Sequence, residues 1–405
     1  MCDARYFTAK HGKGGAGSMS VRPRLCFMVT SSLTAATFLR GYMKFLRQQG
    51  WDVTVICAPG PGVAEMAQAD GVSLHTLEMR RDPALLRDLV SLGRTAILLR
   101  KLRPDVVVYA TPKASLLGAI GGAMAGITVR VYEQWGLRLE TLSGFRRFIL
   151  AGVERLTAKL STTIVANSRS LSDRLRTLKL SGGRDVVVLG DGSAHGVDTT
   201  HFSSDVETAG LDRDTRTFVT AHENMLRICF VGRLHPDKGI ETLLEGMSAA
   251  GRAGVRVAAI LVGPSEGAEK NIGVHTRYSQ LNLRLVGEVV DTRPYLDASD
   301  VLVLMSRREG FPTVVLEAAS MGIPAIVANS TGTVDSVVDG VTGIVVPVGD
   351  SQMLADALAT LANDRQLLSA YGMAARQRAI DRFDQTHVWR MHSEYFLELL
   401  ERSRR

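Results

Sequence analysis

Residues 306–318 read Ser-Arg-Arg-Glu-Gly-Phe-Pro-Thr-Val-Val-Leu-Glu-Ala, and they are the most informative stretch of the chain. The preceding run 301–305, Val-Leu-Val-Leu-Met, has the continuous apolar character of a buried strand. Pro312 is typical of a helix start, because its missing N–H would have no partner there. The predicted order is therefore a strand, a loop with Glu309 and a helix with Glu317. In an open parallel sheet, anionic ligands bind where a helix begins at the carboxyl end of a strand.

Apolar strand-like runs alternate with helical runs along most of the chain, which predicts an α/β fold with parallel sheets. In the first half we expect strands at 25–30, 53–57, 106–110, 129–132, 163–166 and 186–189. The helices expected between them are notably 37–49, 83–102 and 145–160. In the second half we expect strands at 227–231, 255–262, 283–286, 301–305, 325–328 and 344–346.

A polar stretch without periodicity, residues 198–224, separates the two apolar halves and is interpreted as a linker. We expect a leader without structure at 1–21, one Rossmann-like domain at 22–205 and a second at 206–382. The last segment, 383–405, carries an apolar helical stripe that must be buried, and packing back on the first domain would bury it. Two α/β units imply a cleft between them, where ligands commonly bind.

Length and composition indicate a globular protein of two or three domains, with 405 residues of which 45% are hydrophobic. No run reaches the roughly 20 apolar residues that a membrane-spanning helix needs. The first 21 residues lack the apolar centre of a signal peptide. The four cysteines are scattered without metal-binding spacing, which predicts buried thiols and a reducing, cytoplasmic compartment.

The net charge of +7 is concentrated in one region. Residues 80–159 carry 14 Lys and Arg against 6 Asp and Glu, an excess of eight. Within this region 145–150, Phe-Arg-Arg-Phe-Ile-Leu, combines arginine with apolar bulk at helical spacing. Such a face can lie on an anionic membrane at its cytoplasmic side, and a solvated helix flank is the alternative. Nucleic acid is not expected as a partner, since aromatic residues are few and no binding motif is present.

The second half opens with 229–239, Cys-Phe-Val-Gly-Arg-Leu-His-Pro-Asp-Lys-Gly. A predicted buried strand ends at Gly232, and two cations, Arg233 and Lys238, follow it ahead of a helix. Arginine offers a bidentate fork and lysine a compact charge, so the pair suits a diphosphate. A turn with solvated charges would give the same pattern, and only the combination with the segment around Glu309 favours a site.

These segments together resemble glycosyltransferase family 4, the retaining enzymes of the GT-B fold. The resemblance covers the whole second half, through 229–239, 261–264 (Leu-Val-Gly-Pro), 285–287 (Leu-Val-Gly), 306–318 and 338–343 (Val-Asp-Gly-Val-Thr-Gly). It implies two Rossmann-like domains that face each other across a cleft. It also implies a nucleotide-sugar donor and catalysis by fixed cations, with neither a metal ion nor a cofactor.

The resemblance assigns roles to the charged residues. Arg233 and Lys238 would bind the donor's diphosphate and stabilise the charge that develops on it. Glu309 would contact hydroxyls of the donor sugar, and Glu317 would bind the ribose hydroxyls. From the residues alone, Glu309 could equally be a helix-capping acid and Glu317 a solvated helical position.

The resemblance also assigns backbone positions. The strand end at Gly232 and the N–H groups around Gly310, Phe311 and Thr313 would face the phosphate or sugar. The nucleobase would lie near Val286 and Gly287.

Polar residues follow the first predicted strand where the family often has glycines. Ser31, Ser32 and Thr34 could meet the donor or acceptor, or they could cap the next helix.

No catalytic histidine can be named. Many members of the family carry one after the strand that ends here at Ala110, where this chain has Thr-Pro-Lys-Ala-Ser at 111–115. Lys113 is the charged candidate at that place, as a phosphate ligand or a surface lysine. His195, in a glycine-rich segment before the linker, is interpreted as a hinge or cleft-lining residue.

The Thr-Pro-Lys run and 330–335, Ser-Thr-Gly-Thr-Val-Asp, are similar to a narrower group, the bacterial capsular and O-antigen polysaccharide transferases. This similarity implies a lipid-linked or glycan acceptor, which a loop with Arg138 and Glu140 would face. The single Asp-x-Asp, at 212–214, lies in the polar linker and is interpreted as solvated rather than metal-binding.

We therefore expect a retaining, metal-independent glycosyltransferase that uses a nucleotide sugar, with UDP as the family-weighted base, at the inner face of the plasma membrane. Two other functions fit the two-domain architecture. A UDP-N-acetylglucosamine 2-epimerase-like isomerase would need acid/base carboxylates and histidines in the cleft. A non-catalytic subunit that binds nucleotide sugars is compatible with the missing histidine.

Overall fold

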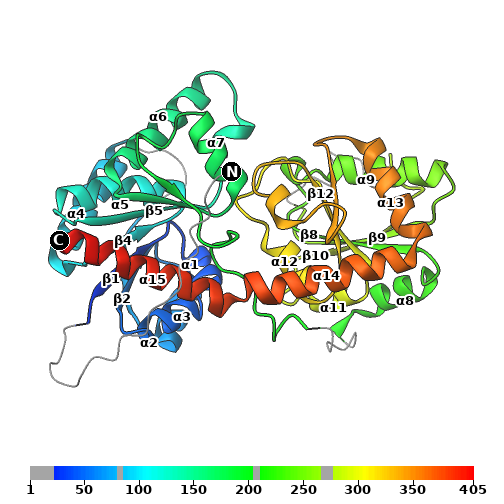
Figure 1. Cartoon of the computed structure of the whole chain (residues 1–405), viewed down its shortest axis with the longest axis horizontal. Coiled ribbons are helices and arrows are strands. Elements are labelled where there is room, and N and C mark those ends of the chain that lie inside the picture. Colours follow the sequence, from blue (N-terminus) through cyan, green and yellow to red (C-terminus); the bar gives the residue numbers. More distant parts are fainter. Residues whose placement is uncertain (1–21, 80–84, 204–209, 266–276) are drawn as a thin grey trace.

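The computed structural model describes residues 22–79, 85–203, 210–265 and 277–405, and it shows two lobes (Figure 1). Over these residues, each lobe is built on one parallel sheet, of seven strands in the first lobe and six in the second. The predicted α/β architecture is confirmed. The expected leader lies outside the described residues.

Both sheets have the same plan: the first strand of each lies inside the sheet, and the order reverses beside it. The strand orders are β3-β2-β1-β4-β5-β6-β7 and β10-β9-β8-β11-β12-β13. The first sheet contains β1 (Arg24–Met28), β2 (Asp52–Cys57), β3 (Ser73–Thr76), β4 (Val106–Tyr109), β5 (Val129–Gln134), β6 (Thr163–Ala166) and β7 (Val186–Val187). The second contains β8 (Leu226–Val231), β9 (Val257–Val262), β10 (Asn282–Gly287), β11 (Val301–Leu304), β12 (Ala325–Ala328) and β13 (Gly343–Val346).

Among the described residues, helices connect most successive strands and cover the sheets (Figure 1). The first lobe has α1 (Ser32–Phe38), α2 (Tyr42–Gln48), α3 (Val63–Asp70), α4 (Leu85–Leu102), α5 (Pro112–Met124), the 3-10 helix η1 (Arg138–Thr141), α6 (Gly144–Leu160) and α7 (Arg169–Thr177). The second has α8 (Arg213–Ala221), the 3-10 helix η3 (Pro236–Lys238), α9 (Ile240–Arg252), α11 (Arg293–Asp297), α12 (Thr313–Ser320), the 3-10 helix η4 (Val334–Ser336), α13 (Ser351–Asn363), α14 (Arg365–Phe383) and α15 (Gln385–Arg404).

The first sheet is buried on both faces. Along β1, Leu25 and Phe27 belong to one apolar cluster, while Cys26 and Met28 belong to the cluster on the other side. Successive strand side chains point to opposite faces, so a strand covered on both sides must be apolar throughout. Continuous apolar runs of this kind, rather than alternating ones, were the signal that identified the strands in the sequence.

The C-terminal helix α15 returns to the first lobe, as the sequence predicted (Figure 1). Trp389 stacks on Tyr42 of α2 with ring centroids 5.6 Å apart. Trp51 donates from Nε1 to Ser393 Oγ over 3.0 Å, and both side chains are buried. The apolar stripe of α15 thus completes the core of a lobe that the chain left some 200 residues earlier.

The chain crosses between the lobes at two places that pair with each other. Val197 N–H donates to Phe383 O over 2.8 Å, and Gln385 N–H donates to Val197 O over 2.9 Å. Around this point Phe383, the last residue of α14, packs against Phe311 with ring centroids 5.2 Å apart. The connection between the lobes therefore packs against the loop that follows β11.

Three sequence predictions were wrong. The helix expected at 37–49 is two helices, because Gly41 adopts a φ of 77° and its N–H donates to Asp70 instead of continuing the helix. The polar run 198–224 contains α8, which packs beside β10. The edge strand β3 was missed, because its sequence Ser-Leu-His-Thr is too short and polar to stand out.

Truncation of Phe396 to alanine tests how much the first lobe depends on α15. The side chain is fully buried against Trp51, and loss of a buried phenylalanine typically lowers the free energy of unfolding by about 3–5 kcal/mol. We expect a loss of this size in urea titrations followed by tryptophan fluorescence, because all three tryptophans lie in or against the first lobe. Leu397→Ala, at the neighbouring 37% exposed position, is the control and should change stability by less than about 1 kcal/mol. Equal effects of the two substitutions would mean that α15 does not stabilise this lobe.

Candidate active site

A cavity of about 300 Å³ lies between the lobes. Its first-lobe wall is formed by Phe38, Trp135, Asn167, Ser193, Ala194 and His195. Its second-lobe wall is formed by Val231, Lys238, Leu304, Glu309, Gly310, Phe311, Pro312, Thr313 and Val314. The second-lobe residues come from the ends of β8 and β11, the loops that follow them and the start of α12, and the two strands are hydrogen-bonded neighbours in the sheet. Because both strands are parallel, their carboxyl ends deliver these loops to the same edge.

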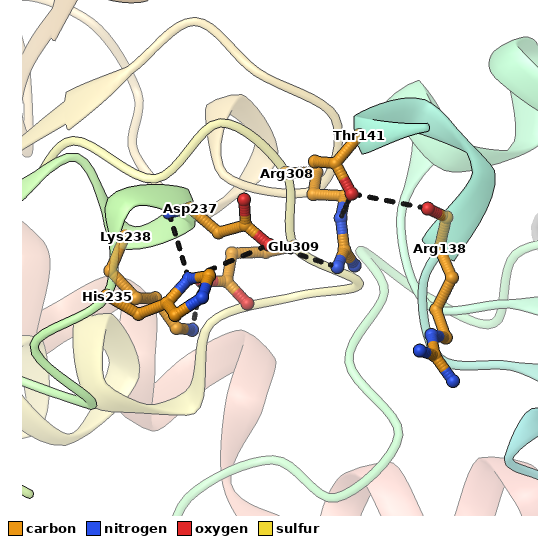
Figure 2. A network of polar contacts seen from close by, with 7 residues as sticks. All are labelled: Arg138, Thr141, His235, Asp237, Lys238, Arg308 and Glu309. Atoms are coloured by element: carbon orange, nitrogen blue, oxygen red, sulfur yellow. Dashed lines mark hydrogen bonds and ion pairs between the residues drawn. The ribbon is translucent and has the colours of Figure 1, made fainter. Parts of the chain in front are cut away.

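An ion pair between Lys238 and Glu309 is the centre of the site (Figure 2). Lys238 Nζ donates to Glu309 Oε1 over 2.5 Å, and the two side chains are 24% and 17% exposed. A charge-assisted bond between partly buried groups is stronger than a surface ion pair, since less water competes for it. The two residues that the sequence singled out are thus brought into direct contact.

The loop after β8 places Lys238 by means of a tight turn. Its 3-10 helix η3 is capped by His235, whose Nδ1 accepts from the Asp237 N–H over 3.2 Å. Gly239 follows with a φ of 70°, and a Cβ there would lie 2.0 Å from Met305 O at the end of β11. Only glycine fits so close to the neighbouring strand, which fixes the distance between the two loops.

The loop after β11 is held against both lobes. Glu309 N–H donates to Thr331 O over 2.8 Å. A Cβ on Gly310 would lie 2.2 Å from Trp135 O in the first lobe, so glycine is needed for the lobes to approach this closely. Pro312 precedes α12 as its N-cap, and the N–H groups of Thr313 and Val314 lie in the first turn, where they have no partner within the helix. The cavity therefore faces a helix N-terminus, as the sequence predicted.

Glu317 lies one turn further along α12 and is partly buried. Among the described residues, its carboxylate has no hydrogen-bond or ion-pair partner. Burial raises the pKa of Glu317 from 4.5 to about 7. A carboxylate in this position gains from any ligand that donates hydrogen bonds to it.

A series of polar contacts connects this site to the first lobe (Figure 2). Arg308 Nη2 lies 3.5 Å from Asp237 Oδ2, and Arg308 Nε donates to Thr141 Oγ1 in η1 over 3.2 Å. Arg138, at the start of η1, is exposed, and Figure 2 shows its side chain pointing away from Lys238 and Glu309. Arg138 is therefore near the cleft but outside the ion-pair network.

The first-lobe residues singled out by the sequence have local partners. Ser31 caps α1, accepting from Thr34 N–H over 3.1 Å, so the capping alternative holds for these two. Ser32 is buried beside Gly60. Lys113 binds Asp88 of α4 at 2.6 Å with its side chain 12% exposed. Lys113 thus ties α5 to α4 rather than standing as a surface lysine.

The remaining predicted donor residues lie outside the set that lines the cavity. Gly232 directly follows β8 and its N–H donates to Val262 O over 2.9 Å, while Arg233 is exposed just beyond it. Val286 and Gly287 end the edge strand β10, two strands away from β8. They share the carboxyl edge of the sheet with Lys238 and Glu309.

The sequence analysis did not place Trp135 and Phe38 in the site, and it gave His195 no chemical role. All three line the cavity and pack together: the His195 ring centroid lies 4.9 Å from that of Trp135 and 5.3 Å from that of Phe38. The available signal was position, because Trp135 directly follows β5 and His195 lies in the glycine-rich segment after β7.

Other groups singled out by the sequence have structural roles. The sequence predicted that Asp212 is only solvated. In the structure Asp212 caps α8, and its carboxylate binds Arg284 of β10 at 2.8 Å. Over the described part of the chain, no three His, Cys, Asp or Glu side chains converge as metal ligands would. Among the described helices, none combines the length and apolarity needed to cross a membrane. Cys26, Cys57 and Cys229 are buried thiols, as predicted.

Comparison with known proteins shows that this two-lobed protein is an enzyme of the glycosyltransferase class. Residues 226–364 match the family model "Glycosyl transferases group 1", and residues 34–192 match "Glycosyl transferase 4-like domain". The chain belongs to this glycosyltransferase family.

Relatives and solved structures extend the similarity over nearly the whole chain. The capsular polysaccharide biosynthesis glycosyltransferase CapM of Staphylococcus aureus is 33% identical over 355 residues, covering 87% of this chain and 91% of CapM. The UDP-Gal:alpha-D-GlcNAc-diphosphoundecaprenol alpha-1,3-galactosyltransferase of Escherichia coli is 23% identical, covering 84% and 87%. The structure of Anabaena HepE in complex with UDP and glucose has a TM-score of 0.70 at 20% identity, covering 92% and 98%.

The raised pKa of Glu317 predicts a pH-dependent penalty on stability that Glu317→Gln removes. Below pH 4.5 the carboxyl is protonated in both folded and unfolded chains, so the substitution has no titration effect there. Between pH 4.5 and about 7 the unfolded chain loses this proton and the folded chain keeps it, so the wild type loses stability relative to the variant as the pH rises. Above pH 7 the difference should level off at about 3 kcal/mol, from 1.36 kcal/mol per pKa unit. Urea titrations across this range measure it, and a pH-independent difference would contradict the assignment.

Proposed function

We propose that this protein is a retaining, metal-independent glycosyltransferase that moves a sugar from a UDP-sugar to a lipid-linked acceptor in cell-surface polysaccharide synthesis. The observation that carries the proposal is the Lys238–Glu309 ion pair, which lies in an interlobe cavity at the carboxyl ends of β8 and β11.

The charges of the site suit a nucleotide diphosphate sugar. Lys238, with the exposed Arg233 on the same loop, would bind the diphosphate and stabilise the negative charge that grows on it as the glycosidic bond breaks. Glu309 would accept hydrogen bonds from the sugar's hydroxyls. Glu317, whose carboxylate has no partner among the described residues, would accept from the ribose hydroxyls. The N–H groups at the start of α12 would face the phosphate or sugar.

The base and acceptor are proposed from relatives together with the site. The E. coli relative is named for UDP-galactose and a diphosphoundecaprenol-linked N-acetylglucosamine, and HepE is described with UDP. In this chain the base would lie at the end of β10, near Val286 and Gly287, on the edge of the sheet that also carries Lys238. CapM is named for capsular polysaccharide, which supports a capsule- or O-antigen-type product.

An amphipathic surface on the first lobe supports contact with an anionic membrane. Helices α4, α5 and α6 pack side by side, and large apolar side chains project from α4 and α6 into solvent. Their exposed fractions run from 48% for Ile149 to 75% for Phe145. The side chains are Leu89, Val90, Ile97, Phe145, Phe148 and Ile149. They are interspersed with Arg94, Arg100, Lys101, Arg146 and Arg147. Exposed apolar residues among cations at helical spacing match an interfacial helix.

This surface adjoins the active site, which favours a lipid-linked acceptor. Helix α6 begins at Gly144, three residues after Thr141, whose hydroxyl accepts a hydrogen bond from Arg308 beside the ion pair (Figure 2). A lipid held at α6 would therefore present its head group near the cleft. Peripheral attachment to the inner face of the plasma membrane follows from this proposal.

Of the two other functions, an epimerase-like isomerase finds no support in the family, which is that of glycosyltransferases. A non-catalytic subunit would not need a preorganised Lys238–Glu309 pair, and the turnover experiment below separates it from an enzyme.

Substitution of the ion pair tests the proposed chemistry. We expect Lys238→Ala to lower kcat with a UDP-sugar by about 10²–10³-fold, the usual loss when one charge-stabilising donor is removed. Glu309→Ala should lower kcat more than it weakens donor binding. UDP release, with a synthetic N-acetylglucosamine diphospholipid as acceptor, measures both, and activity should persist in EDTA.

Lys44→Ala, an exposed lysine on α2, is the control for a lost positive charge and should behave as the wild type. UDP at 100 times its Kd should stabilise the wild type by about 2.7 kcal/mol. Normal turnover in both active-site variants would overturn the assigned roles, and UDP binding without any turnover would favour the non-catalytic subunit.

Charge reversal on α6 tests the membrane contact. Each cation near an anionic surface contributes about 1 kcal/mol, so Arg146→Glu with Arg147→Glu should lower the partitioning onto phosphatidylglycerol vesicles by at least tenfold. Arg213→Glu with Arg252→Glu, on exposed positions of the second lobe, makes the same charge change and should have a much smaller effect. Equal sedimentation of all three proteins with vesicles would rule out this surface as the attachment site.

A further inference from the structure

His195 is the cavity-lining residue whose chemistry the proposed function leaves unused. It lines the same cavity as Lys238 and Glu309. Both of its ring nitrogens are buried, and neither has a hydrogen-bond partner among the described residues. Buried polar atoms without a hydrogen-bond partner are unfavourable, so a ligand that pairs with them binds more tightly.

The backbone around His195 is held rigidly in an unfavourable conformation. Ser193 has a φ of 69°, which non-glycine residues rarely adopt, and its N–H donates to Asn167 O over 2.6 Å. Ser193 Oγ accepts from Gly196 N–H over 3.0 Å, and the Val197 N–H donates a hydrogen bond to Phe383 O. A strained segment persists when its surroundings fix it, and such segments gather at binding sites. The loop therefore presents the imidazole to the cavity in a fixed position.

The imidazole belongs to a cluster with two aromatic rings. Its centroid lies 4.9 Å from that of Trp135, at an interplanar angle of 81°, and 5.3 Å from that of Phe38, and the two aromatic rings are themselves 5.9 Å apart. Trp135 is itself anchored, because its Nε1 donates to Glu133 Oε2 over 3.0 Å. A half-turn of the imidazole about χ2 exchanges its nitrogens with ring carbons and preserves its outline. The two ring orientations therefore occupy the same space beside Trp135 and Phe38, and the hydrogen bonds of a ligand can select between them.

The imidazole is uncharged at physiological pH. Burial, and to a smaller extent the nearby His392, lowers the pKa of His195 to about 3. A neutral imidazole has one N–H donor and one acceptor nitrogen, which matches a sugar hydroxyl, itself both donor and acceptor. A phosphate would instead favour a charged imidazolium. The aromatic walls add apolar surface for the C–H groups of a sugar ring.

We propose that His195 is a sugar-binding residue, which hydrogen-bonds a hydroxyl of the sugar ring held in the cavity beside Glu309 and so contributes to the choice of sugar. This inference rests on the proposed function, since it assumes that a sugar enters this cavity. His195 takes part from a loop remote in sequence from the position where a histidine was sought, after the strand that ends at Ala110.

His195→Phe and His195→Gln test the proposal. Phenylalanine keeps a ring in contact with Trp135 and Phe38 but removes both nitrogens, whereas glutamine keeps a donor and an acceptor. We expect His195→Phe to lower kcat/KM for UDP-glucose, UDP-galactose or UDP-N-acetylglucosamine, whichever the wild type uses, by about 10–100-fold. His195→Gln should recover part of this loss. The Kd for UDP should change less than twofold in both, which also shows that the variants are folded.

Two kinetic arms identify the sugar. A loss in donor kcat/KM at saturating acceptor assigns the hydroxyl to the transferred sugar, and a rise confined to the KM of the N-acetylglucosamine diphospholipid assigns it to the acceptor. His222→Phe replaces a histidine at the end of α8, outside the lining residues, and should leave both unchanged.

Wild-type kcat/KM for donor and acceptor in His195→Phe would overturn the inference, as would an equal loss of UDP binding. Failure of the proposed function is distinct, because the wild type itself would then neither bind UDP nor release it from a UDP-sugar.

Discussion

The site depends on one constraint: β8 and β11 are neighbours in a parallel sheet, although Lys238 and Glu309 are 71 positions apart. Parallel neighbours require crossover connections. The strand order reverses between β8 and β11, so the loops that follow these two strands leave the same edge of the sheet in different directions. Gly239, which packs against the end of β11, sets how close the loops come. A partly buried cation without its partner would be unfavourable, so the ion pair also stabilises the loop arrangement that creates it.

The same loops hold the lobes together. Thr331 accepts from Glu309 N–H and donates to Glu140 Oε1 over 2.8 Å, and Arg174 binds that carboxylate at 2.9 Å. Asp335 accepts from Ser170 in α7. The loops that line the cavity and those that join the lobes are therefore hydrogen-bonded to one another. His195 and Glu309 line the cavity from different lobes, so the shape of the cavity depends on how these contacts hold the lobes together.

Much of the fold could be predicted because a doubly covered parallel sheet imposes continuous apolar runs, which are visible in the sequence. The loops that carry Lys238 and Glu309 could also be located from the sequence, since each loop follows such a run. The rest depends on packing between distant segments. The break at Gly41 depends on Asp70 in α3, and the place of His195 depends on a loop bonded to Asn167 and Phe383. No local pattern encodes such partners.

The site has an interior with little net charge and cations further out, and this distribution fits the proposed ligand. Lys238 and Glu309 neutralise each other, and His195 is uncharged, so the interior carries little net charge. The cations Arg233 and Arg308 lie further out. A sugar is uncharged and its diphosphate is not, so the sugar would enter while the diphosphate stays toward Lys238 and the cations. The diphosphate would then compete with Glu309 for Lys238. Binding of the donor would thereby release Glu309 to accept hydrogen bonds from the sugar beside His195, so that the sugar-binding form of the pocket is completed by the nucleotide that carries the sugar.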